Sequence, residues 1–91
     1  MSQVREVADI DNQVVDATTA KTFVAPAGAR GCFISCKTAD IWVWPDGSHT
    51  AAASDGLLIP AGQPPVYLPF AQDISAFGSG ASCPTSVCWV K

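Results

Sequence analysis

Short apolar runs separated by turn residues organise the whole chain, and none of them shows the period of an amphipathic helix. The three alanines at 51–53 lead to a glycine and form too short a run to nucleate a helix. The other runs are bounded by Gly, Pro, Asp or Ser, which is typical of strands joined by turns. The segments expected to be strands are residues 13–17, 21–26, 31–38, 40–45, 56–62, 65–70, 73–78 and 86–91.

This pattern predicts an all-β fold, an antiparallel β-sandwich or small β-barrel of about eight short strands. Residues 1–12 are expected to form an extended N-terminal arm or a first edge strand, and residues 13–91 a single β-sandwich domain. Prolines in the strand at 65–70 favour an edge position or a bulge, because proline cannot donate to a ladder. Residues 79–85 are expected to be a loop before the last strand.

Alternation within the strands predicts which side chains share a face. Cys32, Ile34 and Cys36 fall on one face of their strand. In the segment DIWVWP, Trp42 and Trp44 point one way, and Ile41 and Val43 point the other. The residues expected in the core are Ile34, Val43, Leu58, Ile59, Ile74 and Val87.

Composition changes this picture in one respect, because it indicates assembly. Only 14% of the 91 residues are charged, against about 25% in an average soluble domain, while 48% are hydrophobic. So few charges leave much apolar surface on a free monomer, so we expect part of it to be buried against another chain. The net charge of −3 argues against a nucleic-acid partner, which requires a basic stripe. No apolar run reaches the length of a membrane span, and the first residues contain no secretory signal pattern, so no membrane partner is expected.

The four cysteines at 32, 36, 83 and 88 leave two interpretations open. Without a secretory signal, we expect reduced thiols that behave as small hydrophobic side chains, with Cys32, Cys36 and Cys88 in the core. The alternative is two disulfides, for which three pairings exist. The spacings are poor for zinc, since Cys32 and Cys36 on one strand would lie about 13 Å apart. We therefore expect no metal and no cofactor.

The sequence offers little for catalysis. His49 is the only histidine, and the cysteines with which it could pair lie in strands expected to be buried, where thiols are usually inert. The carboxylates are scattered singly or at turns, so we expect no catalytic residues and no enzyme. The tryptophans Trp42, Trp44 and Trp89 could form a stacking platform for a sugar, but a tryptophan pair on one strand face is more often core or interface.

Three segments of the chain carry a resemblance to a known class of proteins. GLLIPAGQ (56–63), ISAFGSGA (74–81) and VCWV (87–90) are each built from turn glycines and alternating apolar residues. Together they resemble small β-sandwich structural proteins of the virions of tailed bacteriophages. The resemblance covers about the last two-thirds of the chain and carries no catalytic residues. The four cysteines and three tryptophans depart from the pattern.

The resemblance implies a capsid decoration (cement) protein that stabilises the mature capsid from its exterior after assembly in the host cytoplasm. Its expected partners are the major capsid protein and copies of itself, with a trimer favoured. Two alternatives stay open, a tail or head–tail accessory protein of the same fold and a carbohydrate-binding module for host surface glycans. The residues expected to make contacts are Val4, Val7, Ile10, Trp42, Trp44, Tyr67 and Phe70.

Overall fold

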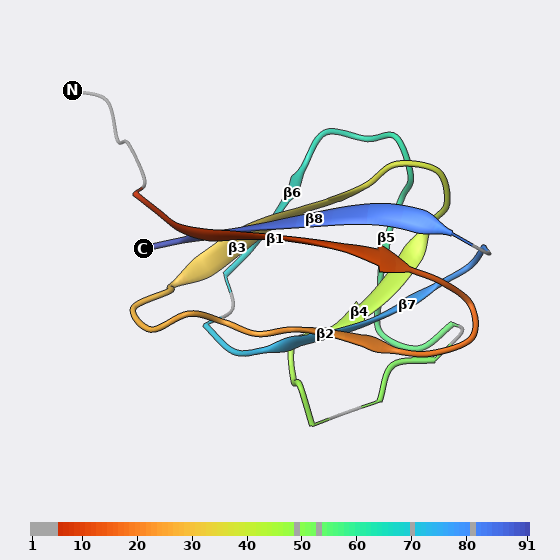
Figure 1. Ribbon diagram of the computed structural model, residues 1–91, viewed down its shortest axis with the longest axis horizontal. Helices are drawn as coiled ribbons and strands as arrows, with labels where there is room; N and C mark the ends of the chain where they lie inside the picture. Colours follow the sequence, from red (N-terminus) through yellow and green to blue (C-terminus); the bar gives the residue numbers. More distant parts are fainter. Residues whose placement is uncertain (1–5, 49, 53, 70, 81) are drawn as a thin grey trace.

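The computed structural model describes residues 6–48, 50–52, 54–69, 71–80 and 82–91, and it is built from eight strands. They are β1 (Val7–Val15), β2 (Lys21–Phe23), β3 (Gly31–Cys36), β4 (Ile41–Trp44), β5 (Leu57–Ile59), β6 (Val66–Leu68), β7 (Ile74–Gly78) and β8 (Cys83–Val90). The strands form two antiparallel sheets with the orders β1-β8-β3-β6 (sheet A) and β2-β7-β4-β5 (sheet B), which lie over a common core (Figure 1). The predicted all-β fold is confirmed. No helix in the described part of the chain could span a membrane.

The first and last strands pair with each other along most of their length. β1 and β8 run side by side in Figure 1, in register from Val15 opposite Cys83 to Val7 opposite Val90, with an irregularity between Val7 and Asp9. β1 is an edge of sheet A. It is continuous across position 12, the limit between the predicted N-terminal arm or first edge strand (1–12) and the predicted domain (13–91). Residues 1–5 lie outside the described residues, so an arm before β1 stays a prediction.

The core is built from the inward side chains of both sheets. Five of the six residues expected there are buried: Ile34, Val43, Ile59, Ile74 and Val87. The expectation for Leu58 was wrong, because its side chain is 51% exposed. Ile59 pairs with Ile41 on the inner face, and alternation then turns Leu58 outward. The two largest fully buried side chains are those of Trp89 and Phe23.

The last strand begins earlier than the sequence suggested. Residues 79–85 were expected to form a loop, but β8 starts at Cys83 and alternates inward through Cys83, Thr85, Val87 and Trp89. Pro84 concealed this start, since proline is rare in central strands. It is tolerated because it lies opposite Lys37, just beyond the end of β3, where its carbonyl accepts a hydrogen bond from the Lys37 amide (3.2 Å).

The proline-rich strand lies where its composition predicted. β6 forms the other edge of sheet A and pairs with β3 alone. One side of an edge strand needs no backbone donors, so the neighbouring prolines cost no ladder hydrogen bonds there.

Candidate interaction surfaces

The residues expected to make contacts lie on two opposite faces of the molecule. Val7 and Ile10 on β1 and Tyr67 on β6 belong to the outer face of sheet A, whereas Trp42 and Trp44 on β4 belong to the outer face of sheet B. Val4 and Phe70 lie outside the described residues. The sequence pattern alone could not separate the two groups, because alternation gives faces of single strands and not the sheet to which each strand belongs.

The outer face of sheet A carries a row of apolar side chains from edge to edge. Ile10 lies opposite Cys88, Cys88 opposite Phe33, and Phe33 opposite Tyr67. The Phe33 and Tyr67 rings are tilted by 51° with centroids 5.1 Å apart, a favourable edge-to-face arrangement. Tyr67 also lies over Gly31, where an added Cβ would stand 2.6 Å from its hydroxyl oxygen. The tyrosine end of this row is therefore packed, and the Ile10 end is open.

The outer face of sheet B is partly covered by the loop between β4 and β5. In that loop Ala51 is buried, and its amide donates a hydrogen bond to Ser75 Oγ (3.0 Å) on β7. Gly56 approaches the Trp44 ring so closely that an added Cβ would lie 2.9 Å from Cδ1. Trp42, by contrast, lies between Leu58 and Phe77 on the neighbouring strands. The loop thus holds Trp44, while Trp42 belongs to the open part of this face.

Trp89 cannot belong to the sugar-stacking platform that was considered for the three tryptophans. This side chain is fully buried on the inner face of β8, opposite Cys32, so it cannot stack on a ligand. The signal was present in the sequence, since Trp89 shares its alternation with Val87, which was expected in the core. Of the three tryptophans, Trp42 and Trp44, both half-buried, remain as candidates for a sugar-stacking surface.

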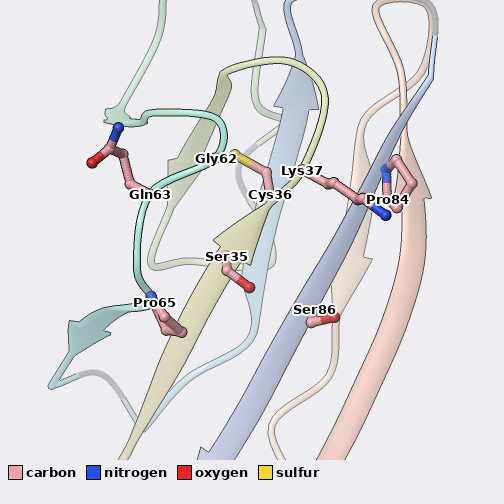
Figure 2. A pocket seen from close by; sticks show the side chains of 8 residues that line it. All are labelled: Ser35, Cys36, Lys37, Gly62, Gln63, Pro65, Pro84 and Ser86. Atoms are coloured by element: carbon pink, nitrogen blue, oxygen red, sulfur yellow. The ribbon is translucent and has the colours of Figure 1, made fainter.

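A shallow hollow of about 380 Å³ lies on sheet A beside the turn before β6. Ser35 and Ser86 form its floor from paired positions of β3 and β8, and Ser86 Oγ donates to Asn12 Oδ1 (2.6 Å). Figure 2 shows the Cys36 sulfur turned toward Gly62 and the Lys37 side chain reaching toward Pro84. The hollow offers hydroxyl, amide and ammonium groups to a polar ligand. Its described lining contains no carboxylate or histidine that could act as a base.

The four cysteines are free thiols, and three of them are buried. Cys88 was expected in the core but is half-buried, because it alternates with the inward Val87 and faces outward opposite Phe33. Burial, with a smaller contribution from Cys88, raises the pKa of Cys32 to about 11. Burial, followed by the neighbouring Cys83, raises the pKa of Cys36 to about 11. Both thiols are therefore protonated and unreactive at neutral pH.

Cys83 behaves differently from the other buried thiols. Burial acts to raise its pKa, but backbone hydrogen bonds from Thr38, Ala39 and Lys37 outweigh burial and lower it. The thiol itself donates to the Ala39 carbonyl (2.9 Å). Within the described ranges, no group of three or more His, Cys, Asp or Glu could hold a metal ion. His49, the histidine considered as a partner for a thiol, lies outside those ranges.

Three carboxylates accept hydrogen bonds that hold loops and turns in place. Asp73 Oδ1 accepts the Ala25 amide (2.8 Å), and Asp40 Oδ1 accepts the Ala61 amide (2.8 Å), each joining segments far apart in sequence. Asp16 Oδ1 accepts both the hydroxyl and the amide of Thr18, and these bonds lower the pKa of Asp16. Such roles leave the open ends of the two outer faces as the strongest candidates for a functional surface.

Comparison of the chain with protein-family models, curated proteins and solved structures finds no match.

Proposed function

We propose that this chain is a bacteriophage virion structural protein, a capsid decoration (cement) protein that forms a small oligomer, with a trimer favoured, and bridges major capsid proteins on the capsid exterior. One observation carries the proposal, the placement of the exposed large apolar side chains. Among the described residues, all six lie on an edge strand or directly beside one: Val7, Ile10, Val14, Val24, Leu57 and Leu58. Apolar side chains at sheet edges are positions that a neighbouring subunit can cover.

The segments that resemble phage virion proteins give further support of a limited kind. They fall on β5 and its following turn, on β7, and on the end of β8. Two of their glycines have positive φ, Gly56 at 102° and Gly62 at 70°. These glycines shape the turns of the sandwich, so the resemblance supports a shared architecture and does not identify the contact residues.

The mechanism of a decoration protein is thermodynamic. A protein that binds only the assembled lattice stabilises that lattice by mass action, in proportion to the logarithm of its concentration over its dissociation constant. Each contact can be of modest size, because an oligomer that engages several lattice subunits gains from multivalency. The open ends of the two outer faces give one chain two separate contact regions, as a bridging protein requires.

Quantitative mass spectrometry of purified particles tests this function by the copy number of the chain relative to the major capsid protein. A number of copies comparable to that of the major capsid protein is expected for a decoration protein. A few copies per particle would instead indicate a tail or head–tail accessory protein. Absence from particles would overturn the virion proposal, and a glycan array would then test the carbohydrate-binding alternative.

A further inference from the structure

The edge strand β1 differs from the other three edges of the two sheets. β1 has nine residues, whereas β2, β5 and β6 have three each. β6 is additionally flanked by Pro65 and Pro69, which cannot donate to an added strand. β1 lies along the margin of sheet A in Figure 1 and is the longest edge in the described part of the chain. Long edges are templates for pairing with another chain.

The hydrogen-bond pattern of sheet A shows which backbone groups of β1 are open. The Arg30 amide donates to Val90 O (2.8 Å) and the Lys37 amide to Pro84 O (3.2 Å), so the even-numbered residues of β8 bond to the β3 side. In an antiparallel ladder the odd-numbered residues of β8 then bond to β1. Their partners are Asp9, Asp11, Gln13 and Val15. The amides and carbonyls of the alternate residues, Ile10, Asn12 and Val14, therefore point to the open side.

The side chains of β1 add a second, independent feature. Val7, Ile10 and Val14 are 53%, 56% and 52% exposed, so this one strand carries half of the exposed large apolar side chains in the part of the chain that the structure describes. They lie on the outer face of sheet A, where Ile10 continues the row through Cys88 and Phe33. A strand added at this edge would extend the sheet and cover these apolar groups with its own outward side chains.

The other face of β1 is acidic. Asp9 is exposed, Asp11 is half-buried, and neither forms an ion pair with another described residue. Among the described residues, the side-chain partner of the Asp11 carboxylate is the neutral Gln13 amide, which donates to it (3.3 Å). At the start of the strand, Glu6 adds a further negative charge, which Lys91 meets at 3.7 Å. Positively charged side chains on an added strand would find their counter-charges at Asp9 and Asp11.

We propose that the β1 edge docks an extended basic segment of a partner protein, in which apolar residues alternate with Lys or Arg, as an added strand of sheet A. The backbone of the segment bonds to Ile10, Asn12 and Val14. Its apolar side chains cover the outer row, and its cations lie beside Asp9 and Asp11. This is strand addition, in which main-chain hydrogen bonds give affinity and alternate side chains give specificity.

A second copy of β1 is a poorer occupant of the same edge. Two copies can pair antiparallel about a two-fold axis with Ile10 opposite Ile10, with Ile10 opposite Asn12, or with Asn12 opposite Asn12. Asp11 of one copy then lies opposite Asp9, opposite Asp11, or diagonal to Asp11 of the other copy. Like charges at such positions are destabilising. The acidic face thus acts against self-pairing and favours a cationic partner.

The inference deepens the proposed function, since it names the contact surface and the chemistry of the partner segment, and it rests on that function only for the identity of the partner. Its test uses the isolated full chain in solution and makes no use of particles. Failure of the strand-addition test would leave the copy number in virions unaffected, and absence from virions would leave the edge and its binding properties unaffected.

The experiment is a titration of the ¹⁵N-labelled chain with a short acetylated and amidated peptide in which lysine and valine alternate. We expect the amide signals of β1 to shift and the exchange of the Ile10, Asn12 and Val14 amide hydrogens to slow by about tenfold or more on binding. The exchange rates of the Asp11 and Gln13 amides should change little, because these amides already donate to β8. A peptide of the same composition with the lysines grouped together should bind at least about tenfold more weakly.

Variants test the two halves of the proposal separately. Ile10→Pro removes an edge amide without removing a bond to β8, and it should weaken binding about tenfold relative to its control Ile10→Thr, which keeps the amide. The double variant Asp9→Asn, Asp11→Asn should bind the lysine–valine peptide and a glutamate–valine peptide with equal affinity, whereas the natural chain should prefer the lysine–valine peptide. Shifts confined to other strands, equal binding of the grouped peptide, or slowed exchange of the same amides through self-association would overturn the proposal. The exchange measurement on the natural chain decides the matter even if Ile10→Pro does not fold.

Discussion

Trp42 lies directly opposite Leu58 in the β4–β5 pair, and both side chains point away from the core of the sandwich. Trp44, two residues further along the same face, lies instead beside Gly56 at the end of the loop that covers Ser75. Two tryptophans with the same orientation in one strand therefore differ in what surrounds them. Trp42 lies between outward side chains of the neighbouring strands, whereas Trp44 lies against the loop.

Replacing each tryptophan by alanine should separate these roles. Trp44→Ala removes a ring packed under the loop and should lower the free energy of unfolding by about 2–3 kcal/mol. Trp42→Ala should cost about 1 kcal/mol, but it should weaken self-association of the chain, because tryptophans at a surface are favoured contact residues. Urea unfolding and sedimentation velocity measure the two effects. A loss of stability for Trp42→Ala as large as that for Trp44→Ala would contradict the distinction.

Trp89 should dominate the stability of the core. Trp89→Ala empties a fully buried site and should destabilise the fold by about 3–5 kcal/mol. Trp89→Phe should cost less, about 1–2 kcal/mol, because the buried indole nitrogen of Trp89 has no hydrogen-bond partner among the described residues, so phenylalanine forfeits no bond. Equal losses for the two variants, measured by urea unfolding, would show that the indole nitrogen is bonded and that its removal carries the cost.

Two glycines with positive φ should differ in their tolerance of a side chain. At Gly62 an added Cβ meets nothing within 4 Å, so Gly62→Ala should cost only the backbone strain, about 1 kcal/mol. At Gly56 the added Cβ would lie against the Val43 carbonyl, and the backbone itself must move, so Gly56→Ala should cost about 3 kcal/mol or more. Thermal unfolding of both variants compares them. The reverse order would mean that the loop between β4 and β5 adjusts freely.

Alkaline pH should destabilise the fold through the buried thiols. Cys32 and Cys36 have pKa values raised from 9.0 to about 11, so above pH 9 the unfolded chain releases these protons and the folded chain holds them. Their contribution is complete below pH 9 and is lost as the pH rises toward 11, by about 1.4 kcal/mol per unit for each thiol. The lowered pKa of Cys83 acts in a different window, because its contribution is present in full above pH 9 and is lost as the pH falls through the folded value.

The measurement is the free energy of unfolding between pH 9 and 11 for the natural chain and for Cys32→Ala. Other titrating groups affect both proteins alike, so the difference in slope isolates one thiol. The natural chain should lose stability more steeply by about 1.4 kcal/mol per pH unit. Parallel curves would show that Cys32 is not shielded from solvent in the folded state.

The thiols should also differ in their accessibility to reagents. Cys88 is half-buried on the outer face of β8, while Cys32, Cys36 and Cys83 are buried, so a maleimide should label the folded chain first at Cys88. Labelling of the other three should follow unfolding. Peptide mapping by mass spectrometry identifies the sites, with Cys88→Ser as the control that should stay unlabelled while folded. A reductant should leave the melting temperature unchanged, since a structural disulfide would contribute about 2–4 kcal/mol.

The sequence pattern predicted the architecture further than it predicted the surface. Alternation within single strands correctly gave the shared face of Cys32, Ile34 and Cys36 and the shared orientation of Trp42 and Trp44. Proline content correctly gave the edge position of β6. The errors occurred where a strand is apolar on both faces or contains an unexpected residue, as at Leu58 and at Pro84.

The amino-acid sequence by itself determined that the chain is all-β, where most strands lie and which side chains alternate within them, because these features depend on local period and on turn residues. Only the tertiary structure decided that β1 pairs with β8 and that Ile10 and Trp42 lie on opposite faces. Strand order depends on contacts between residues far apart in the chain. A two-residue period gives each strand two faces, and the packing of the partner strands determines which face is buried.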